Sequence, residues 1–179
     1  MNTNLEHGTR NVEPVIRPET SADEPAIRRV IAAAFGGTGE ADLVDALRRD
    51  GAVLVAAVAE RAGEILGHVA FSRMFVEASD GHRVPAAALA PLAVAPASQR
   101  QGIGDALTRH GLERLRALGE RIVIVLGHPA YYPRFGFSSA LAHALESPFE
   151  RDAFMALELA PGALDGVRGR VVYPRAFGL

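Results

Sequence analysis

The chain has 179 residues, of which 49% are hydrophobic, and its formal net charge is −2. This length and composition suffice for one domain with a substantial apolar core. The arginines are scattered among acids, so the chain lacks the basic concentration expected of a nucleic-acid-binding protein. The absence of cysteine excludes disulfides, thiolate metal sites and a cysteine nucleophile.

The first residues differ in composition from the rest of the chain. Residues 1–13, MNTNLEHGTRNVE, are polar and lack the apolar segment of a secretory signal. We therefore expect a flexible leader over 1–13 and a single domain over 14–179. The apolar stretches are all far shorter than a membrane span, so we expect a cytoplasmic protein that does not bind membranes.

The first half predicts two helices followed by an antiparallel meander. After a short strand over 15–17, Ser21 and Glu24 have the spacing of a capping box, and apolar residues recur at helical spacing up to Phe35. A second, shorter helix follows and ends at Gly51. Three apolar runs then predict strands over 52–59, 65–76 and 83–94.

The second half has a different pattern. The third of these strands leads through two glycines into a helix, which we expect over 103–118. An apolar strand over 122–126 follows, and a strand, a helix and a strand at this spacing make a right-handed unit with two parallel neighbours. Closing strands are expected over 154–159 and 169–173. The predicted buried face of the helix consists of Ile103, Leu107, Gly111, Leu115 and Leu118.

The loop before this helix, Gln99-Arg-Gln-Gly-Ile-Gly104, has the features of an anion site. A helix N-terminus carries unpaired N–H groups and the positive end of the helix dipole, which suit a phosphate. Gly102 and Gly104 have no Cβ, so a phosphate could approach their nitrogens, and Arg100 adds a positive charge. A plain strand-to-helix turn is the alternative interpretation. The lysine of a P-loop and the third glycine of a dinucleotide fingerprint are both absent.

Two segments together resemble the GNAT superfamily of N-acetyltransferases. Gln99–Gly104 resembles its acyl-CoA loop Q-x-x-G-x-G, and the preceding Leu92-Ala-Val94 resembles the end of its fourth strand. Tyr131-Tyr-Pro-Arg-Phe-Gly-Phe137 resembles the motif after its fifth strand. The two motifs stand in the order of the family, and the resemblance extends from Val15 to the C-terminus. The run Val125–Phe137 is similar to a bacterial branch usually called YhbS-like.

The resemblance implies a mixed α/β fold with a central, mostly antiparallel sheet flanked by helices. Its fourth and fifth strands form a parallel pair that splays apart and holds the thioester of acetyl-CoA. The pantetheine arm would pair with the main chain at the end of the fourth strand, and the pyrophosphate would bind the N–H groups of the loop. The residues implied to hold acetyl-CoA are Leu92, Ala93, Val94, Gln99, Arg100, Gln101, Gly102, Ile103, Gly104 and Asp105.

Acetyl transfer to an amine needs an acid for the leaving thiolate, a donor for the oxyanion and a base for the amine. The resemblance implies Tyr132 as the acid and the N–H of Leu92 as the oxyanion donor. Tyr131 aligns with an apolar position of the motif and is the weaker candidate. Aromatic packing is the structural alternative for both tyrosines.

The base is not evident from the sequence. Many members of the family carry a glutamate on the fourth strand, but residues 88–94 contain no acid. Glu40 is our first candidate, although it could simply complement a helix dipole. His128 and His82 come next. A water chain, or an acceptor amine of low pKa, would make a base residue unnecessary.

We therefore predict an N-acetyltransferase that transfers an acetyl or short acyl group from acetyl-CoA to a primary amine by direct attack in a ternary complex. The missing cysteine closes a route through an acyl-cysteine. An acyl-CoA-binding sensor or partner module with a degenerate site, and a protein that binds another phosphate ligand, are the alternatives. No histidine pair has metal-ligand spacing, so we expect no metal. The acceptor, a small molecule or peptide, and a homodimer are left open; residues 35–40 and the hairpin near Asp80 are expected to shape the acceptor pocket.

Overall fold

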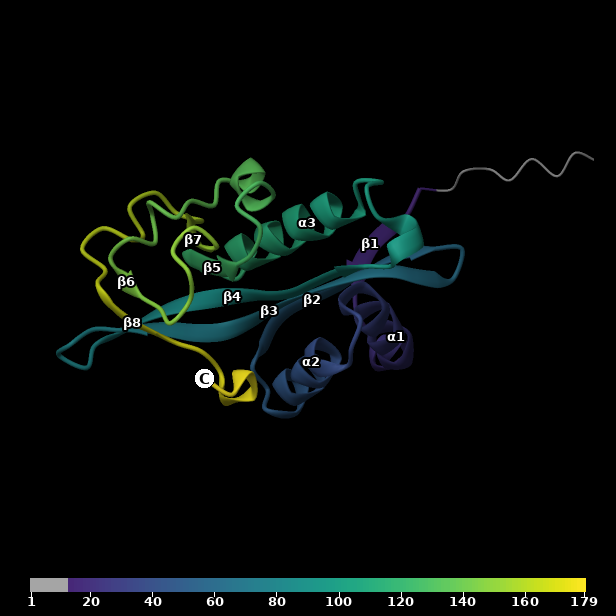
Figure 1. The fold of residues 1–179 in the computed structure, drawn as a ribbon, viewed down its shortest axis with the longest axis horizontal. Helices are drawn as coiled ribbons and strands as arrows, with labels where there is room; N and C mark the ends of the chain where they lie inside the picture. Colours follow the sequence, from purple (N-terminus) through teal and green to yellow (C-terminus); the bar gives the residue numbers. More distant parts are fainter. Residues whose placement is uncertain (1–12) are drawn as a thin grey trace, which may run out of the picture.

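The computed structural model describes residues 13–179, so all but the last residue of the predicted leader lies outside the described residues. In this part of the chain three α-helices and eight strands are present (Figure 1). The helices are α1 (Glu24–Phe35), α2 (Gly39–Arg49) and α3 (Ile103–Ala117). The strands are β1 (Val15–Pro18), β2 (Val53–Arg61), β3 (Glu64–Glu77), β4 (Arg83–Val94), β5 (Ile122–Leu126), β6 (Leu145–Glu146), β7 (Phe154–Glu158) and β8 (Gly169–Val172).

The strands form one mixed sheet in the order β1-β2-β3-β4-β5-β7. Only β4 and β5 are parallel along this path, as the strand–helix–strand pattern predicts. The other pairs on the path are antiparallel. The predicted fold class is therefore confirmed. β8 extends the sheet by pairing with the far part of β3, and β6 pairs with β8 in parallel. The sequence did not predict β6, because two residues are too few to show a pattern.

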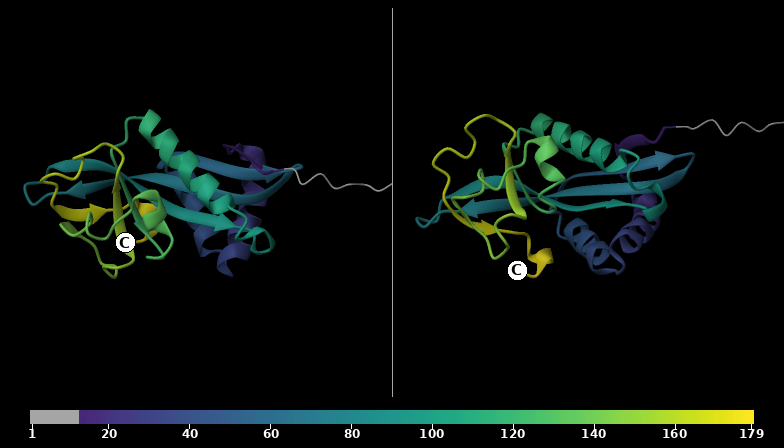
Figure 2. Two further views of the ribbon diagram at one scale, coloured as in Figure 1. Left: turned by 90° about the horizontal axis from the view of Figure 1, so that it is seen from above. Right: turned by 45° about the horizontal axis from the view of Figure 1, so that its top comes forward.

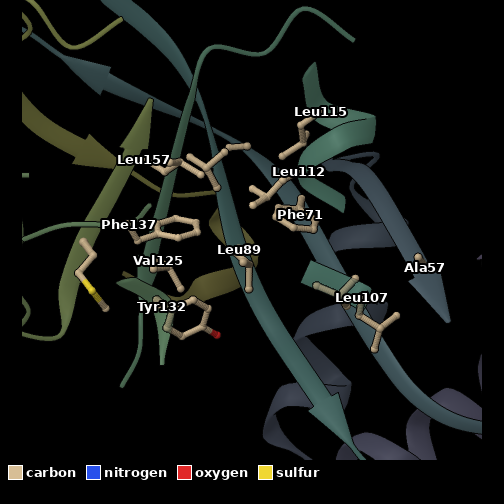
Figure 3. Packing of buried hydrophobic residues seen from close by; sticks show 14 of the residues in the cluster. Ala57, Phe71, Leu89, Leu107, Leu112, Leu115, Val125, Tyr132, Phe137 and Leu157 are labelled. Atoms are coloured by element: carbon tan, nitrogen blue, oxygen red, sulfur yellow. The ribbon is translucent and has the colours of Figure 1, made fainter. Parts of the chain in front are cut away.

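Helices cover both faces of the sheet. α1 and α2 lie on one face and α3 on the other, and the views in Figures 1 and 2 agree on this arrangement. On the α3 face Leu107, Leu112 and Leu115 pack against the sheet around Phe71, all almost fully buried (Figure 3). On the opposite face Ile27 and Ile31 of α1 belong to a buried cluster with Ile65 of β3 and Ala93 of β4, the strands on which α1 packs. The apolar periodicity of each helix thus defines the side that meets the sheet.

Two details of the helix predictions are wrong. The capping box is formed by Thr20 and Asp23 at the start of a short 3₁₀ turn that precedes α1, not by Ser21 and Glu24 at the helix itself. The Asp23 carboxylate is fixed further by Arg17, whose guanidinium donates to it at 2.7 and 2.8 Å. Leu118 is 57% exposed, since it lies one residue past the end of α3 and leaves the buried stripe.

No helix within residues 13–179 has both the length and the apolar character needed to cross a lipid bilayer.

Candidate functional site

The last part of β4 has an open edge. β4 pairs with β5 only from Ala87 to Leu89, and the two strands separate beyond that point. On its other side β4 remains paired with β3, and the N–H of Ala95 donates to Leu66 at 2.8 Å. Main-chain groups alternate sides along a strand, so the N–H groups of Leu92 and Val94 point away from β3 toward this open side. An extended ligand could pair with them as an additional strand.

A β-bulge marks the beginning of this open edge. Between the pairs Phe71–Leu89 and Val69–Leu92, two residues of β4, Ala90 and Pro91, stand opposite the single residue Ala70. The Ala90–Pro91 peptide bond is cis. Proline inside a strand is confined to edges and bulges, because it has no N–H to donate to the ladder. Pro91 was therefore a signal in the sequence for this irregularity.

The loop between β4 and α3 lies directly after the open edge. Its backbone turns through two left-handed residues, Arg100 with φ 59° and Gly102 with φ 81°. The first intrahelical hydrogen bond runs from the N–H of Ala106 to the carbonyl of Gly102 at 3.0 Å. The preceding N–H groups, those of residues 103–105, therefore have no intrahelical acceptor and carry the positive end of the helix dipole. This end of the helix suits an anionic group.

The two glutamines of the loop support its conformation. The side-chain amide of Gln99 donates to the carbonyl of Val94 at 3.2 Å, and that of Gln101 donates to the carbonyl of Ala97 at 3.2 Å. Val94 is a residue of the open edge, so Gln99 links that edge to the loop. The Arg100 side chain is exposed. The structure thus brings the predicted residues 92–94 and 99–105 together in one continuous segment.

The two glycines of the loop serve different needs. Gly102 has a positive φ and open space beside its Cα, as a bared backbone requires. At Gly104 a Cβ would come within 2.8 Å of the Tyr131 hydroxyl, so the room there is taken by that tyrosine. The expectation that both glycines expose nitrogens to a phosphate stays a prediction, since the tyrosine occupies only the side of Gly104 on which a Cβ would lie.

Tyr131 is more closely tied to the loop than the sequence suggested. Its hydroxyl is buried and meets no hydrogen-bond partner in the described part of the chain. Burial, with the nearby carboxylate of Asp105, raises the pKa of this phenol. The guanidinium of Arg134 lies 4.5 Å from the centre of the Tyr131 ring and 3.4 Å from Asp105. Tyr131 therefore joins the first turn of α3 to the segment that follows β5.

A pocket of about 570 Å³ opens where β4 and β5 diverge. Four segments enclose it: the α1–α2 region, the β4 bulge, the end of β5 and the turn that follows. It is lined by Phe35, Glu40, Leu43, Leu89, Ala90, Pro91, Leu92, Leu126, Gly127, His128, Ala130, Tyr131, Tyr132 and Arg134. Three predicted site residues, Glu40, Leu92 and Tyr132, thus share one cavity.

The two histidines considered as the base, His128 and His82, lie in different places. His128 lines the pocket and is exposed. His82 precedes β4 in the hairpin turn, and no residue of that hairpin lines the pocket. The expectation that the hairpin near Asp80 shapes the pocket is therefore wrong. β4 is long, and its bulge lies near the end opposite the hairpin.

Tyr132 is held by close packing at the back of the pocket. It is 9% exposed, and its ring packs edge-on against Tyr131 and Phe137, with centroid distances of 5.0 and 5.7 Å. A Cβ at Gly127 would overlap the ring, so only glycine permits this approach. Figure 3 shows the ring near Val125 and Leu89, with its hydroxyl turned away from Phe137. Burial raises the pKa of Tyr132 to about 12, so it is protonated at neutral pH and can donate a proton.

Glu40 enters the pocket from the first turn of α2, where its side chain is half-buried. Within residues 13–179 no side chain forms an ion pair with it. The neighbouring acids of the same helix, Asp42 and Asp45, are both paired with Arg28. The carboxylate of Glu40 is thus available to a ligand in the pocket. Residues 35–40 were expected to shape the acceptor pocket, and Phe35 and Glu40 line it; no local pattern indicated that the same cavity reaches Leu126 at the end of β5.

Comparison with known proteins identifies the family. Residues 15–140 match the acetyltransferase (GNAT) domain family. The chain is 39% identical to YhbS, an uncharacterized N-acetyltransferase of Escherichia coli strain K12, over 91% of this chain and 98% of that protein. The crystal structure of E. coli YhbS in complex with CoA superposes with a TM-score of 0.87 at 36% identity, covering 97% of this chain and 96% of that one. A GNAT acetyltransferase of Brucella melitensis in complex with acetyl-CoA gives a TM-score of 0.77 at 37% identity, covering 92% of this chain and 97% of that one.

The chain belongs to the GNAT family, and it is an N-acetyltransferase. The resemblance inferred from the two sequence motifs is confirmed over most of the chain. The described residues contain no group of three or more histidine, aspartate or glutamate side chains placed to hold a metal ion.

Proposed function

We propose that the protein transfers an acetyl or short acyl group from acetyl-CoA to a primary amine by direct attack in a ternary complex. The observation that carries this proposal is the open edge of β4, which lies between an unpaired helix N-terminus and a pocket containing a protonated, buried tyrosine. The crystal structures of two relatives of similar length are complexes with CoA and with acetyl-CoA.

The residues of the loop and of the open edge would hold the donor. The N–H groups at the start of α3, with Arg100 beside them, suit the pyrophosphate of CoA. The main chain of Leu92–Val94 would pair with the pantetheine arm, and Gln99 would release the carbonyl of Val94 for that pairing. Acetyl-CoA would supply the acetyl group as a thioester.

The pocket residues would carry out the proton transfers. The N–H of Leu92, which points to the open side, would donate to the oxyanion that forms as the amine nitrogen attacks the carbonyl carbon. Tyr132 would protonate the sulfur as the carbon–sulfur bond breaks. The amine must lose a proton, and Glu40 is the carboxylate in the pocket positioned to accept it.

The direct test is thermal unfolding of the purified protein with and without acetyl-CoA, with ATP and NAD as control ligands. At a hundredfold excess over Kd, binding adds about 2.7 kcal/mol of stability. For a chain of this size we expect an increase in Tm of roughly 5–10 °C with acetyl-CoA alone. An equal increase with ATP would instead indicate a general phosphate site, and no increase with any ligand would contradict the proposal.

The alternative is a module that binds acyl-CoA without turnover. The absence of an acid on β4 is its support, but Glu40 supplies a carboxylate to the same pocket from α2. Release of free CoA thiol in the presence of added amines distinguishes the two functions. The chain contains no lysine, so self-acetylation of lysine side chains does not contribute to the signal.

A further inference from the structure

Two large apolar side chains remain exposed at the pocket. Phe35 is 47% exposed and Leu126 is 44% exposed, and both line the cavity. They come from segments far apart in the sequence, the end of α1 and the end of β5. In residues 13–179 only three other large apolar side chains are as exposed, and none of those lines this pocket. Apolar side chains that converge on a cavity without being buried indicate a surface for an apolar ligand.

The lining between these two residues is also apolar. Leu43 of α2 and Pro91 of the β4 bulge belong to the same cavity, and neither offers a side-chain hydrogen bond. A polar or highly hydroxylated acceptor would lose its hydration here without gaining partners. An aliphatic or aromatic body would instead exchange water for contact with four apolar side chains.

The charges of the pocket restrict the acceptor further. Glu40 forms no ion pair with the described side chains, so a ligand cation would neutralise it. Arg134 is the arginine of the lining, but its guanidinium is already stacked on Tyr131 and lies beside Asp105. A carboxylate or phosphate on the acceptor would therefore find no free arginine at the pocket. A second ammonium group would enter the apolar part without a counter-ion.

We propose that the acceptor is a small primary amine carried on an apolar body, with its nitrogen near Glu40 and its body between Phe35 and Leu126. This inference rests on the proposed function and specifies its acceptor. The cavity of about 570 Å³ is shared with the thioester end of acetyl-CoA at Leu92 and Tyr132, so the room left for the acceptor suits a small molecule.

The test compares the rate of thiol release from acetyl-CoA for a matched series of amines: ethylamine, butylamine, phenethylamine, 1,4-diaminobutane and phenylalanine. One methylene in an apolar pocket changes kcat/KM by roughly 10- to 200-fold. We expect kcat/KM to increase at least about tenfold from ethylamine to butylamine, and phenethylamine to be the best of the series. The diamine and phenylalanine, which add one charged group to butylamine and phenethylamine, should each be at least about tenfold poorer than their parents.

Two variants assign the effect to the pocket. Phe35→Ala and Leu126→Ala should each lower kcat/KM for phenethylamine about tenfold and that for ethylamine by a clearly smaller factor. Leu118→Ala is the matched control, because Leu118 is similarly exposed but does not line the pocket. Equal losses for both amines, or equal losses in the control, would contradict the role of Phe35 and Leu126.

The outcomes separate this inference from the function on which it rests. If acetyl-CoA raises the Tm but ethylamine or 1,4-diaminobutane is the preferred acceptor, the proposed function stands and the apolar acceptor is wrong. Binding of acetyl-CoA with no transfer to any amine of the series also overturns the inference. If acetyl-CoA neither binds nor releases thiol, both proposals fall together.

Discussion

The hydroxyl of Tyr131 lies against the backbone of Gly104, so close that a Cβ there would come within 2.8 Å of it. This contact joins the two sequence motifs of the family, the loop before α3 and the segment after β5. The hydroxyl is buried without a partner among the described residues, which costs stability in the absence of a ligand. A phosphate or carbonyl oxygen of a bound CoA is a suitable acceptor for it.

The first prediction concerns this contact. Gly104→Ala should lower the free energy of unfolding by about 1–2 kcal/mol, because the new methyl group displaces the tyrosine. Tyr131→Phe should leave stability unchanged or raise it slightly, since it removes an unpaired buried hydroxyl. In the double variant most of the loss at Gly104 should be recovered. Urea denaturation of the four proteins measures the coupling.

Gly39→Ala is the control for this cycle. Gly39 also begins a helix, but open space surrounds it, so a methyl group there meets nothing. We expect no loss of stability for this variant. Additive effects of Gly104→Ala and Tyr131→Phe would show that the contact does not determine the outcome.

The second prediction concerns a buried polar cluster beneath α2. Nε2 of His68 lies 2.8 Å from Glu19, whose carboxylate also accepts two hydrogen bonds of 2.8 Å from Arg48. Despite the cost of burial, hydrogen bonds from Arg48 and His68 lower the pKa of Glu19 to about 2, while burial lowers the pKa of His68. Both groups therefore bind protons more readily in the unfolded chain.

The direction of the pH dependence follows from these shifts. Stability should decrease below about pH 6.5 as the unfolded state takes up a proton at His68. It should decrease again below about pH 4.5 through Glu19, by about 3 kcal/mol in total for that group, of which about 2 kcal/mol is lost by pH 3. Urea denaturation from pH 8 to pH 3 measures both steps. In His68→Leu we expect the step near pH 6.5 to disappear and the acid step to remain; an unchanged profile would contradict this assignment.

The third prediction concerns Glu40. Glu40→Gln should lower kcat/KM for amine acceptors about tenfold or more, because it removes the carboxylate that we propose binds the ammonium and accepts its proton. The Kd of acetyl-CoA should remain within about threefold of the original value, because Glu40 is not among the residues proposed to hold CoA. A tenfold change in Kd would correspond to about 1.4 kcal/mol of binding free energy. Steady-state kinetics and calorimetry measure the two quantities.

Asp42→Asn provides the matched control for Glu40. Asp42 is an acid of the same helix but pairs with Arg28 and does not line the pocket. The Asp42→Asn variant should retain most of its kcat/KM for amine acceptors. If both variants lose activity equally, the effect comes from the charge of α2 and not from a contact with the acceptor.

Much of the fold could be predicted because local patterns agree with it. The alternating and helical periodicities gave the order of elements, and the strand–helix–strand pattern gave the parallel β4–β5 pair. Exceptions arose where geometry depends on a few residues. Thr20 replaced Ser21 as the cap because a 3₁₀ turn precedes α1, and Leu118 left the buried stripe one residue beyond α3.

The site was only partly predictable, since its walls come from distant segments. The motif residues Leu92 and Tyr132 were found from local patterns, but the convergence of Phe35 and Leu126 depends on how α1 and α2 pack on the sheet. The hairpin near Asp80 was assigned to the pocket wrongly. From Arg83 to Leu92 the strand extends about 30 Å, so the hairpin at one end of β4 is far from the pocket at the other end. A local sequence pattern does not show this distance. Tyr131 was ranked low because it aligns with an apolar position of the family motif, and no local pattern shows its contact with Gly104.

The central claim is that Tyr132 acts as the acid of acetyl transfer at the open edge of β4, and the variant Tyr132→Phe tests it most directly. We predict that kcat falls about 100-fold or more while the Kd of acetyl-CoA stays nearly constant. Tyr173→Phe is the control, because Tyr173 is a half-buried tyrosine whose pKa is likewise raised to about 12 but which does not line this pocket. An unchanged kcat, or a Kd that rises in proportion to the loss of rate, would contradict the claim and assign Tyr132 a structural role.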